Sequence, residues 1–354
     1  MTEGAVTPNA SPFRMVDPGE FAPSEFILRL PKAELHLHLE GAIDAGTFNQ
    51  LHTNHGEEEL ASAEIARLYE YQDFNGFLMA FKTVTEQLRT AEDYELVTYR
   101  MIQRLRAENV LHAEVYISVG VCLWRGYDFE PLFEGMERGR ERGERDFGVS
   151  LLWIFDAVRQ FGPHAAQCVA EKAVQLRDRH PSIVGFGIGG DERRAAPEIF
   201  QEVYAFARER GLHLVAHAGE TAGPESIWGA LNLRAERIGH ALTAWQDREL
   251  MAVLVQRQVP VEICITSNLR TGCCSAIERH PLRMYFDVGL MLTLNSDDPA
   301  MFGTSLAREY QLAQTAFDLS NEHLRELARN SFEASFLPPE KKLKLLHRID
   351  SMEK

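Results

Sequence analysis

Two histidines that lie two residues apart are the first sign of chemistry in this sequence. His36 and His38 fall in a short apolar segment, residues 33–41, that is typical of a β-strand. Because successive side chains of a strand point to opposite faces, His36, His38 and Glu40 share one face. Two imidazoles on one face can bind a single metal ion, for which zinc is well suited. The pair alone is weak evidence, since ordinary strand histidines show the same spacing.

Three later apolar segments also end in ionisable side chains. They are residues 213–220, 237–240 and 290–299, and the residues at their ends are His217 with Glu220, His240, and Asp297 with Asp298. A carboxylate at the end of a buried strand is costly to desolvate, so it calls for a partner such as a metal ion. Each end alone is equally explained by a helix N-cap or a solvated turn. Four such ends in one chain predict a shared site.

The spacing of the apolar segments predicts a (β/α)8 barrel. Eight short runs recur, at residues 34–39, 110–118, 150–158, 183–188, 213–217, 236–240, 260–266 and 290–295. Runs that are apolar on both faces indicate parallel strands, and amphipathic segments between them supply covering helices. Those segments are residues 93–109, 163–180, 196–210, 223–233, 247–258 and 281–288. An open doubly wound sheet is the alternative, but the polar strand ends are dispersed and no GxGxxG follows the first strand.

The rest of the chain fits a single catalytic domain. Residues 1–24 are polar and contain four prolines, so we expect a flexible tail followed by one barrel domain over residues 25–354. A helical stretch at residues 57–89, between the first two strands, is an insertion that could cover the barrel mouth. Active sites of such barrels lie at the C-terminal ends of the strands.

Charge and cysteine content exclude several classes of protein. The formal net charge of −15 disfavours binding to nucleic acid or to an anionic membrane, since both need basic surfaces. Five cysteines without a CxxC pair indicate free thiols in a reducing compartment. Neither a signal peptide nor a membrane span is evident. We therefore expect a cytoplasmic enzyme with a small-molecule partner, and no feature indicates an oligomeric state.

In a barrel, the strand-end residues would form a mononuclear metal site. The expected ligands are His36, His38, His217 and Asp297, a set suited to zinc, with iron or manganese as substitutes. A metal-bound water can have its pKa lowered to about 7, which provides a hydroxide nucleophile. One metal ion is favoured over two because residues 183–190 lack the lysine that paired-metal barrels often use.

Three further residues are candidates for catalysis beside this metal. Glu220 lies just beyond its strand and could act as a general acid or base. His240 could orient or polarise the nucleophile. Asp298 adjoins a ligand but points elsewhere, which leaves it free to bind the substrate.

Together these residues resemble the adenosine deaminase family of the amidohydrolase superfamily. The similar segments occur in the family's order and span residues 28–340. They are His36-Leu37-His38-Leu39-Glu40-Gly41, Gly189-Gly190-Asp191-Glu192, His217-Ala218-Gly219-Glu220, Gly239-His240, Thr266-Ser267-Asn268 and Ser296-Asp297-Asp298-Pro299. The resemblance implies a zinc-dependent hydrolase that replaces the 6-amino group of a purine by oxygen and releases ammonia.

The resemblance also implies individual roles. Glu220 would protonate purine N1, and His240 would steer the attack on C6. Asp298 would contact N7, and the backbone of Gly190 would contact N3. His38 would lie against the substrate as well as the metal. The H-x-E and P-C-x-x-C signature of cytidine-type deaminases is absent.

These motifs limit the candidate substrates to a few aminopurines but do not select one of them. Glu40, which would meet the ribose side, replaces the aspartate usual in adenosine enzymes, and Gly187 and Tyr116 replace residues that are usually charged there. The adenine branch shares Glu40 but differs at residues 189–192. A third branch, the 6-aminodeoxyfutalosine deaminases of menaquinone biosynthesis, is similar at Arg159, which would pair with the substrate carboxylate. It is also similar at residues 223–228 and 301–306.

The prediction is therefore a deaminase of 6-aminodeoxyfutalosine or adenosine, with adenine as the runner-up substrate. A mononuclear barrel hydrolase acting on another bond is one rival, but it need not retain both Glu220 and Asp298. A catalytically idle scaffold is another, but none of the expected ligands is lost.

Overall fold

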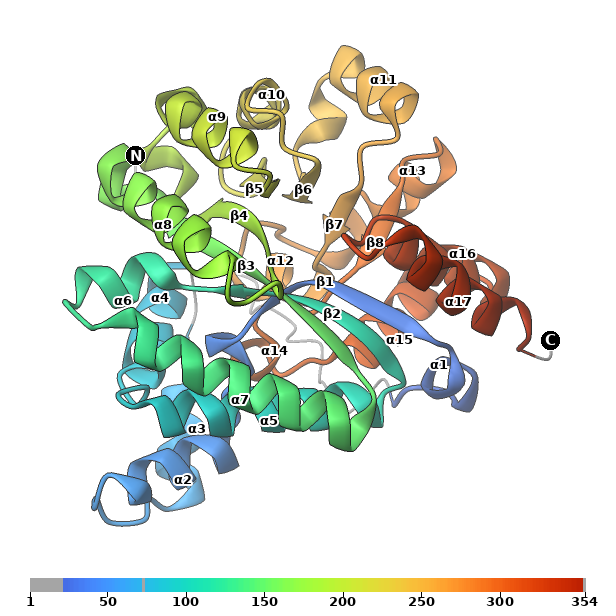
Figure 1. The fold of residues 1–354 in the computed structure, drawn as a ribbon. Coiled ribbons are helices and arrows are strands. Elements are labelled where there is room, and N and C mark those ends of the chain that lie inside the picture. Colours follow the sequence, from blue (N-terminus) through green and yellow to red (C-terminus); the bar gives the residue numbers. More distant parts are fainter. Residues whose placement is uncertain (1–21, 72–73, 353–354) are drawn as a thin grey trace, which may run out of the picture.

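The chain folds as a barrel of eight parallel strands surrounded by helices (Figure 1). The computed structural model describes residues 22–71 and 74–352. Each strand pairs with the next in chain order. The strands are β1 (Lys32–His38), β2 (Val110–Ile117), β3 (Ser150–Val158), β4 (Ile183–Gly189), β5 (His213–Ala218), β6 (Arg237–His240), β7 (Val261–Ile263) and β8 (Leu292–Leu294). The predicted (β/α)8 fold is confirmed.

The barrel closes between β8 and β1, at residues predicted to bind metal. A parallel bridge joins Leu37 to Asp297. The backbone N–H of His38 donates to the carbonyl of Asp297 at 2.8 Å, and the N–H of Asp297 donates to the carbonyl of His36 at 3.0 Å. The closure of the sheet therefore fixes the position of three candidate ligands relative to one another.

Strands β7 and β8 are shorter than the sequence predicts. Residues 265 and 266, expected to end the seventh strand, instead begin the helix α12 (Ile265–Arg270). Beyond β8, the side chain of Asn295 replaces strand pairing, because its Oδ1 accepts the N–H groups of Leu35 and His36 at 2.9 and 3.1 Å. Apolar runs alone do not show where such a side chain takes over from the backbone.

Helices form a ring outside the strands and bury their apolar faces against them (Figure 1). The main ones are α5 (Ala91–Ala107), α7 (Phe129–Phe147), α8 (Gly162–Arg177), α9 (Gln201–Glu209), α10 (Pro224–Asn232), α11 (Arg248–Arg257), α13 (Leu282–Asp287), α15 (Leu306–Ala316), α16 (Asn321–Glu333) and α17 (Pro339–Asp350). α5 begins at a capping box, in which Thr90 Oγ1 accepts the N–H of Asp93 and the Asp93 carboxylate accepts the N–H of Thr90.

The predicted insertion after β1 is helical and lies against the segment that follows β8. It contains α3 (Ser62–Leu68) and α4 (Phe74–Thr85), and a further helix, α2 (Ala45–Asn54), precedes it. The hydroxyl of Tyr71 donates to the carbonyl of Met301 at 2.8 Å. The rings of Phe77 and Phe302 lie 5.0 Å apart. These contacts place the insertion beside α14 (Pro299–Phe302), next to the predicted metal ligands.

The sequence also predicts a tail, a single domain and the absence of a membrane span. The predicted tail, residues 1–24, lies almost wholly outside the described residues, and a single domain over residues 25–354 stays a prediction. Within residues 22–71 and 74–352, no helix has the length and hydropathy that a membrane span requires.

Helix α7 was not predicted, because glycines interrupt its apolar pattern. Gly135, Gly139 and Gly143 recur every four residues and face α5, so the two helices approach closely. A Cβ on Gly135 would lie 2.0 Å from the carbonyl oxygen of Ala91. Glycine at these positions therefore allows α5 and α7 to pack closely together.

We expect Gly135→Ala to destabilise the protein by about 1–3 kcal/mol, because the added methyl overpacks this contact. The control is Gly46→Ala in α2, where the nearest atom to an added Cβ is 3.7 Å away; alanine there should be neutral or slightly stabilising. Urea unfolding measures both. Equal stability of the two variants would contradict the packing role of Gly135.

Candidate metal centre and active site

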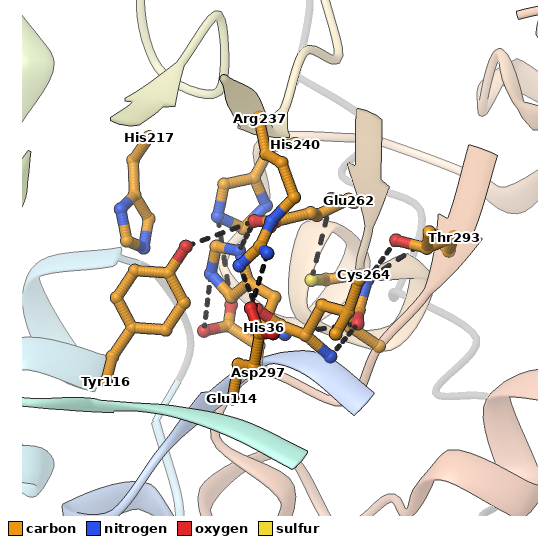
Figure 2. Close-up of polar contacts among 12 residues, drawn as sticks. His36, Glu114, Tyr116, His217, Arg237, His240, Glu262, Cys264, Thr293 and Asp297 are labelled. Carbon is orange, nitrogen blue, oxygen red and sulfur yellow. Dashed lines mark hydrogen bonds and ion pairs between the residues drawn. The ribbon is translucent and has the colours of Figure 1, made fainter. Parts of the chain in front are cut away.

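The four predicted ligands converge at the C-terminal end of the barrel strands. Nε2 of His36 and Nε2 of His38 lie 3.5 and 3.3 Å from Oδ1 of Asp297. His38 Nε2 also lies 3.2 Å from His217 Nε2. Figure 2 shows His36, His217 and Asp297 with His240 around one centre. Residues from β1, β5 and the end of β8 are thereby brought together as the sequence predicts.

Hydrogen bonds at Nδ1 of His217 and of His36 leave the Nε2 lone pair of each imidazole directed toward this centre. Nδ1 of His217 lies 3.0 Å from the carbonyl oxygen of Ile188, which can only accept, so the proton is on Nδ1. Nδ1 of His36 lies 2.8 Å from Oε2 of Glu262, and the carboxylate holds the proton there in the same way. Carboxylate or carbonyl partners of this kind are typical of metal-binding histidines.

The electrostatics of the centre favour a cation. Burial and the neighbouring imidazoles of His36 and His38 lower the pKa of His217 well below its usual value. Burial lowers the pKa of His38 to about 4 despite the nearby Asp297. Burial also lowers the pKa of His36, but the adjacent carboxylates of Asp297 and Glu262 more than offset this and raise it to about 10. Two neutral imidazoles therefore adjoin a position that calls for positive charge.

The donor set fits a zinc-type ion. Three imidazoles and one carboxylate suit borderline metals. The ligand atoms of His36, His38 and Asp297 lie within 4.8 Å of one another. Nε2 of His36 is buried without a hydrogen-bond partner. Ser267 Oγ donates to Asp297 Oδ2 at 2.7 Å and so orients this carboxylate.

A buried network that the sequence analysis missed lies beneath the centre. Arg237 Nε donates to Glu262 Oε1 at 2.6 Å, and its NH1 donates to Glu114. The hydroxyl of Tyr116 donates to Glu262 Oε2 at 3.2 Å. Figure 2 shows these side chains side by side in the barrel interior. The available signal was charged residues at inward positions of otherwise apolar strands.

His240 is held in one tautomer at the edge of the centre. The amide nitrogen of Asn268 lies 3.1 Å from His240 Nδ1, and His280 Nε2 lies 3.2 Å from Asn268 Oδ1. Nδ1 of His240 therefore accepts, and its Nε2 carries the proton, 3.9 Å from both Asp297 Oδ2 and Glu220 Oε2. Burial lowers the pKa of His240 to about 4, so it presents a neutral N–H donor.

Glu220 faces the same centre as an acid. Burial, and then the charges of Asp297 and Glu192, raise the pKa of Glu220 to about 8. The carboxyl therefore carries its proton near neutral pH. The thiol of Cys273 lies 3.8 Å from Glu220 Oε1.

Two other predicted residues each offer a buried oxygen without a partner. One of them is Oδ1 of Asp298. Asp298 packs closely against Gly41, because a Cβ added to Gly41 would lie 1.9 Å from this oxygen. Burial and the adjacent Asp297 raise the pKa of Asp298 well above its usual value. Glu40 accepts the N–H of Ser118 through Oε1 at 2.9 Å and leaves Oε2 unpartnered.

Gly190 and Arg159 have contrasting placements. Gly190 has φ +91°, and a Cβ there would lie 2.3 Å from Gln160 Oε1, so glycine is required beside the site. Arg159 is 0% exposed, and its guanidinium donates to the backbone carbonyls of Ala195 and His217. Its Nε is buried without a hydrogen-bond partner, and pairing of Arg159 with a substrate carboxylate stays a prediction.

Asp156 on β3 is a further buried residue that was not predicted from the sequence. Its carboxylate lies over two glycines of β4, because a Cβ on Gly187 would be 2.9 Å from Oδ1 and one on Gly189 would be 2.8 Å from Oδ2. Oδ1 is buried without a partner. Burial raises the pKa of Asp156 to about 8.

Known proteins resemble the chain over most of its length. The sequence profile of the adenosine deaminase family matches residues 31–352. The aminodeoxyfutalosine deaminase of Streptomyces avermitilis is 37% identical over 329 residues, 92% of either chain. The adenine deaminase of Hahella chejuensis is 35% identical over 329 residues, 92% of this chain and 98% of its own.

Solved structures agree with these sequence matches. The adenine deaminase of Arthrobacter aurescens has a TM-score of 0.85 and 32% identity, covering 91% of this chain and 98% of its own. A zinc-bound amidohydrolase from Burkholderia ambifaria has a TM-score of 0.83 and 26% identity, covering 92% of either chain.

We expect Glu262→Gln to weaken metal binding by about 10–100-fold, because a neutral amide no longer holds the proton on His36 Nδ1. Competition with a chelator, followed by metal analysis, measures the change. Glu249→Gln, at an exposed position, is the matched control. Unaltered metal retention by a folded Glu262→Gln protein would show that this carboxylate does not tune the centre.

Proposed function

The chain belongs to the adenosine deaminase family, and we propose that it deaminates a 6-aminopurine nucleoside, with 6-aminodeoxyfutalosine as the preferred substrate. Its relatives are aminodeoxyfutalosine and adenine deaminases, so the chain is a hydrolytic deaminase of one of these types. One observation carries the proposal: the candidate ligands meet Glu220, His240 and the buried, unpartnered Oδ1 of Asp298 at one barrel mouth. The match to the Streptomyces avermitilis enzyme favours the nucleoside.

A zinc-type ion, held by His36, His38, His217 and Asp297, would supply a water activated for attack at neutral pH. The protein residues supply the remaining groups. His240 Nε2–H is directed toward Asp297 and orients the attacking oxygen. Because its pKa is lowered to about 4, the imidazole acts here as a hydrogen-bond donor and not as a charged acid.

Protonated carboxyl groups would activate and hold the purine. Glu220 donates its proton to N1, which makes C6 electrophilic, and a general acid of this kind works best with a pKa near the working pH. Asp298, also protonated, donates a hydrogen bond to N7. The N–H of Gly190 binds N3, and Glu40 lies on the sugar side.

Free adenine is the second candidate substrate. Several adenine deaminases are 31–35% identical to this chain, and one provides a close structural match. Glu40 is shared with that branch. Arg159 also donates to two backbone carbonyls, which weakens the argument from this residue for a carboxylated nucleoside.

Ammonia release from 6-aminodeoxyfutalosine, adenosine and adenine, compared by kcat/KM, tests the proposal. Preference for 6-aminodeoxyfutalosine supports it. Preference for adenine would assign the chain to the second candidate, and preference for adenosine would retain a nucleoside deaminase with a different substrate. Absence of ammonia from all three with metal-loaded protein would refute aminopurine deamination.

We expect Glu220→Gln to lower kcat by about 10²–10⁴-fold, because the amide cannot deliver a proton to N1. Metal content should stay at the wild-type level, since Glu220 is not a proposed ligand. Glu225→Gln, an exposed neighbour, serves as the control. Near wild-type turnover by Glu220→Gln would remove this residue from the mechanism.

A further inference from the structure

Two oppositely charged buried side chains hold the segment that carries both a candidate ligand and the acid. This segment, residues 217–221, runs from His217 at the end of β5 to just beyond Glu220. We propose that Arg159 and Glu192 form a clamp that positions residues 217–221, so that His217 and Glu220 keep a fixed spacing. The roles of the clamped residues rest on the proposed function.

Glu192 binds the backbone donors of the segment. Its carboxylate accepts the N–H groups of Gly219, Glu220 and Thr221 at 2.7, 2.7 and 2.9 Å, and also the hydroxyl of Ser226. Only 4% of Glu192 is exposed. Three consecutive N–H groups directed at one anion form a concave anion site, which here is filled by a side chain of the same protein.

Arg159 binds the backbone acceptor at the start of the segment. Its NH2 donates to the carbonyl of His217, and its NH1 donates to the carbonyl of Ala195 at 3.2 Å. Ala195 follows the short 3-10 turn that contains Glu192, η3 (Glu192–Arg194). Arg159 therefore ties the end of β5 to the same turn from which Glu192 reaches residues 219–221.

The charge of Glu192 is matched to the hydrogen-bond donors around it. Burial raises the pKa of Glu192, but Ser226, Arg159 and the backbone donors lower it further, so the net shift is downward. The carboxylate is therefore ionised, and each oxygen accepts two hydrogen bonds. A glutamine at 192 would turn an amide N–H toward backbone N–H groups, which leaves buried donors without acceptors.

The segment also has little freedom of its own. Gly219 has φ +72°, and a Cβ there would lie 2.5 Å from Ile227. Thr243 Oγ1 lies 3.1 and 3.0 Å from the carbonyl oxygens of Gly219 and Ala222 and can donate its one proton to either of them. Because the backbone is held on both sides, loss of the clamp is expected to shift Glu220 rather than to unfold the loop.

We expect Glu192→Gln to lower kcat by about 10²-fold with little change in KM, since a displacement of about 1 Å at the reacting groups has this effect. Amide hydrogen exchange at residues 219–221 should accelerate. Glu137→Gln is the matched control, because Glu137 is 5% exposed and accepts Trp153 Nε1 and Ser182 Oγ at 2.6 and 2.9 Å, away from the site. It should lose stability while keeping kcat.

Unchanged kcat and exchange in Glu192→Gln would overturn the clamp, as would an equal loss of kcat in Glu137→Gln. If Glu192→Gln does not fold, Ser226→Ala removes one of the carboxylate's contacts. A smaller loss of kcat with faster exchange at residues 219–221 would then support the clamp, and unchanged values would overturn it.

The substitution Arg159→Ala distinguishes two roles of Arg159: holding residues 217–221, and pairing with a substrate carboxylate. The clamp predicts an equal proportional loss of kcat for adenosine and for a nucleoside with a 5′ carboxylate. A selective rise in KM for the carboxylated nucleoside would overturn the role of Arg159. If wild-type protein deaminates no aminopurine, the proposed function fails, whereas hydrogen exchange at residues 219–221 in Glu192→Gln still decides the clamp.

Discussion

The active centre depends on a line of alternating charge buried inside the barrel. Glu114, Arg237 and Glu262 are at most 1% exposed and are joined by short hydrogen bonds. The line ends at His36, whose Nδ1 bonds to Glu262. Removing one member of a buried pair costs about 3–5 kcal/mol because an uncompensated charge remains. The barrel interior can therefore hold Glu262 as an ionised carboxylate, and Glu262 in turn sets the tautomer of His36.

Three residues at the same end of the barrel have strained backbone conformations. His240, Ala241 and Asp297 have φ values of +66°, +46° and +64°, a region that non-glycine residues rarely adopt. Such conformations cost about 1–3 kcal/mol each and persist only where the surroundings fix them. At Asp297 the surroundings are the two backbone hydrogen bonds that close the barrel onto β1. The sheet closure that stabilises the fold thus also holds a candidate ligand in its strained position.

The sequence predicted the fold and the convergence of His36, His38, His217 and Asp297, because both follow from strand alternation and from where parallel strands end. It did not predict the partners of these residues. Glu262 and Asp156 lie in apolar strands, and only the neighbouring strands show what an inward-pointing charge contacts. The backbone partners of Arg159 were not predicted for a related reason, since these carbonyls are distant in the sequence. Helix α7 was missed because packing against α5 overrides the low helix propensity of glycine.

The protonation states around the centre favour a purine over an amide or a lactone. Burial raises the pKa of Glu220 and of Asp156 to about 8 and that of Asp298 well above its usual value. Near neutral pH these carboxyl groups are acids that can donate hydrogen bonds. A purine ring presents several acceptor nitrogens at its edge, whereas the reacting group of an amide or a lactone presents one strong acceptor, its carbonyl oxygen. If an amide or a lactone bound here, several protonated carboxyl groups would be buried without an acceptor, which costs free energy. This cost favours purine deamination over hydrolysis of an amide or a lactone.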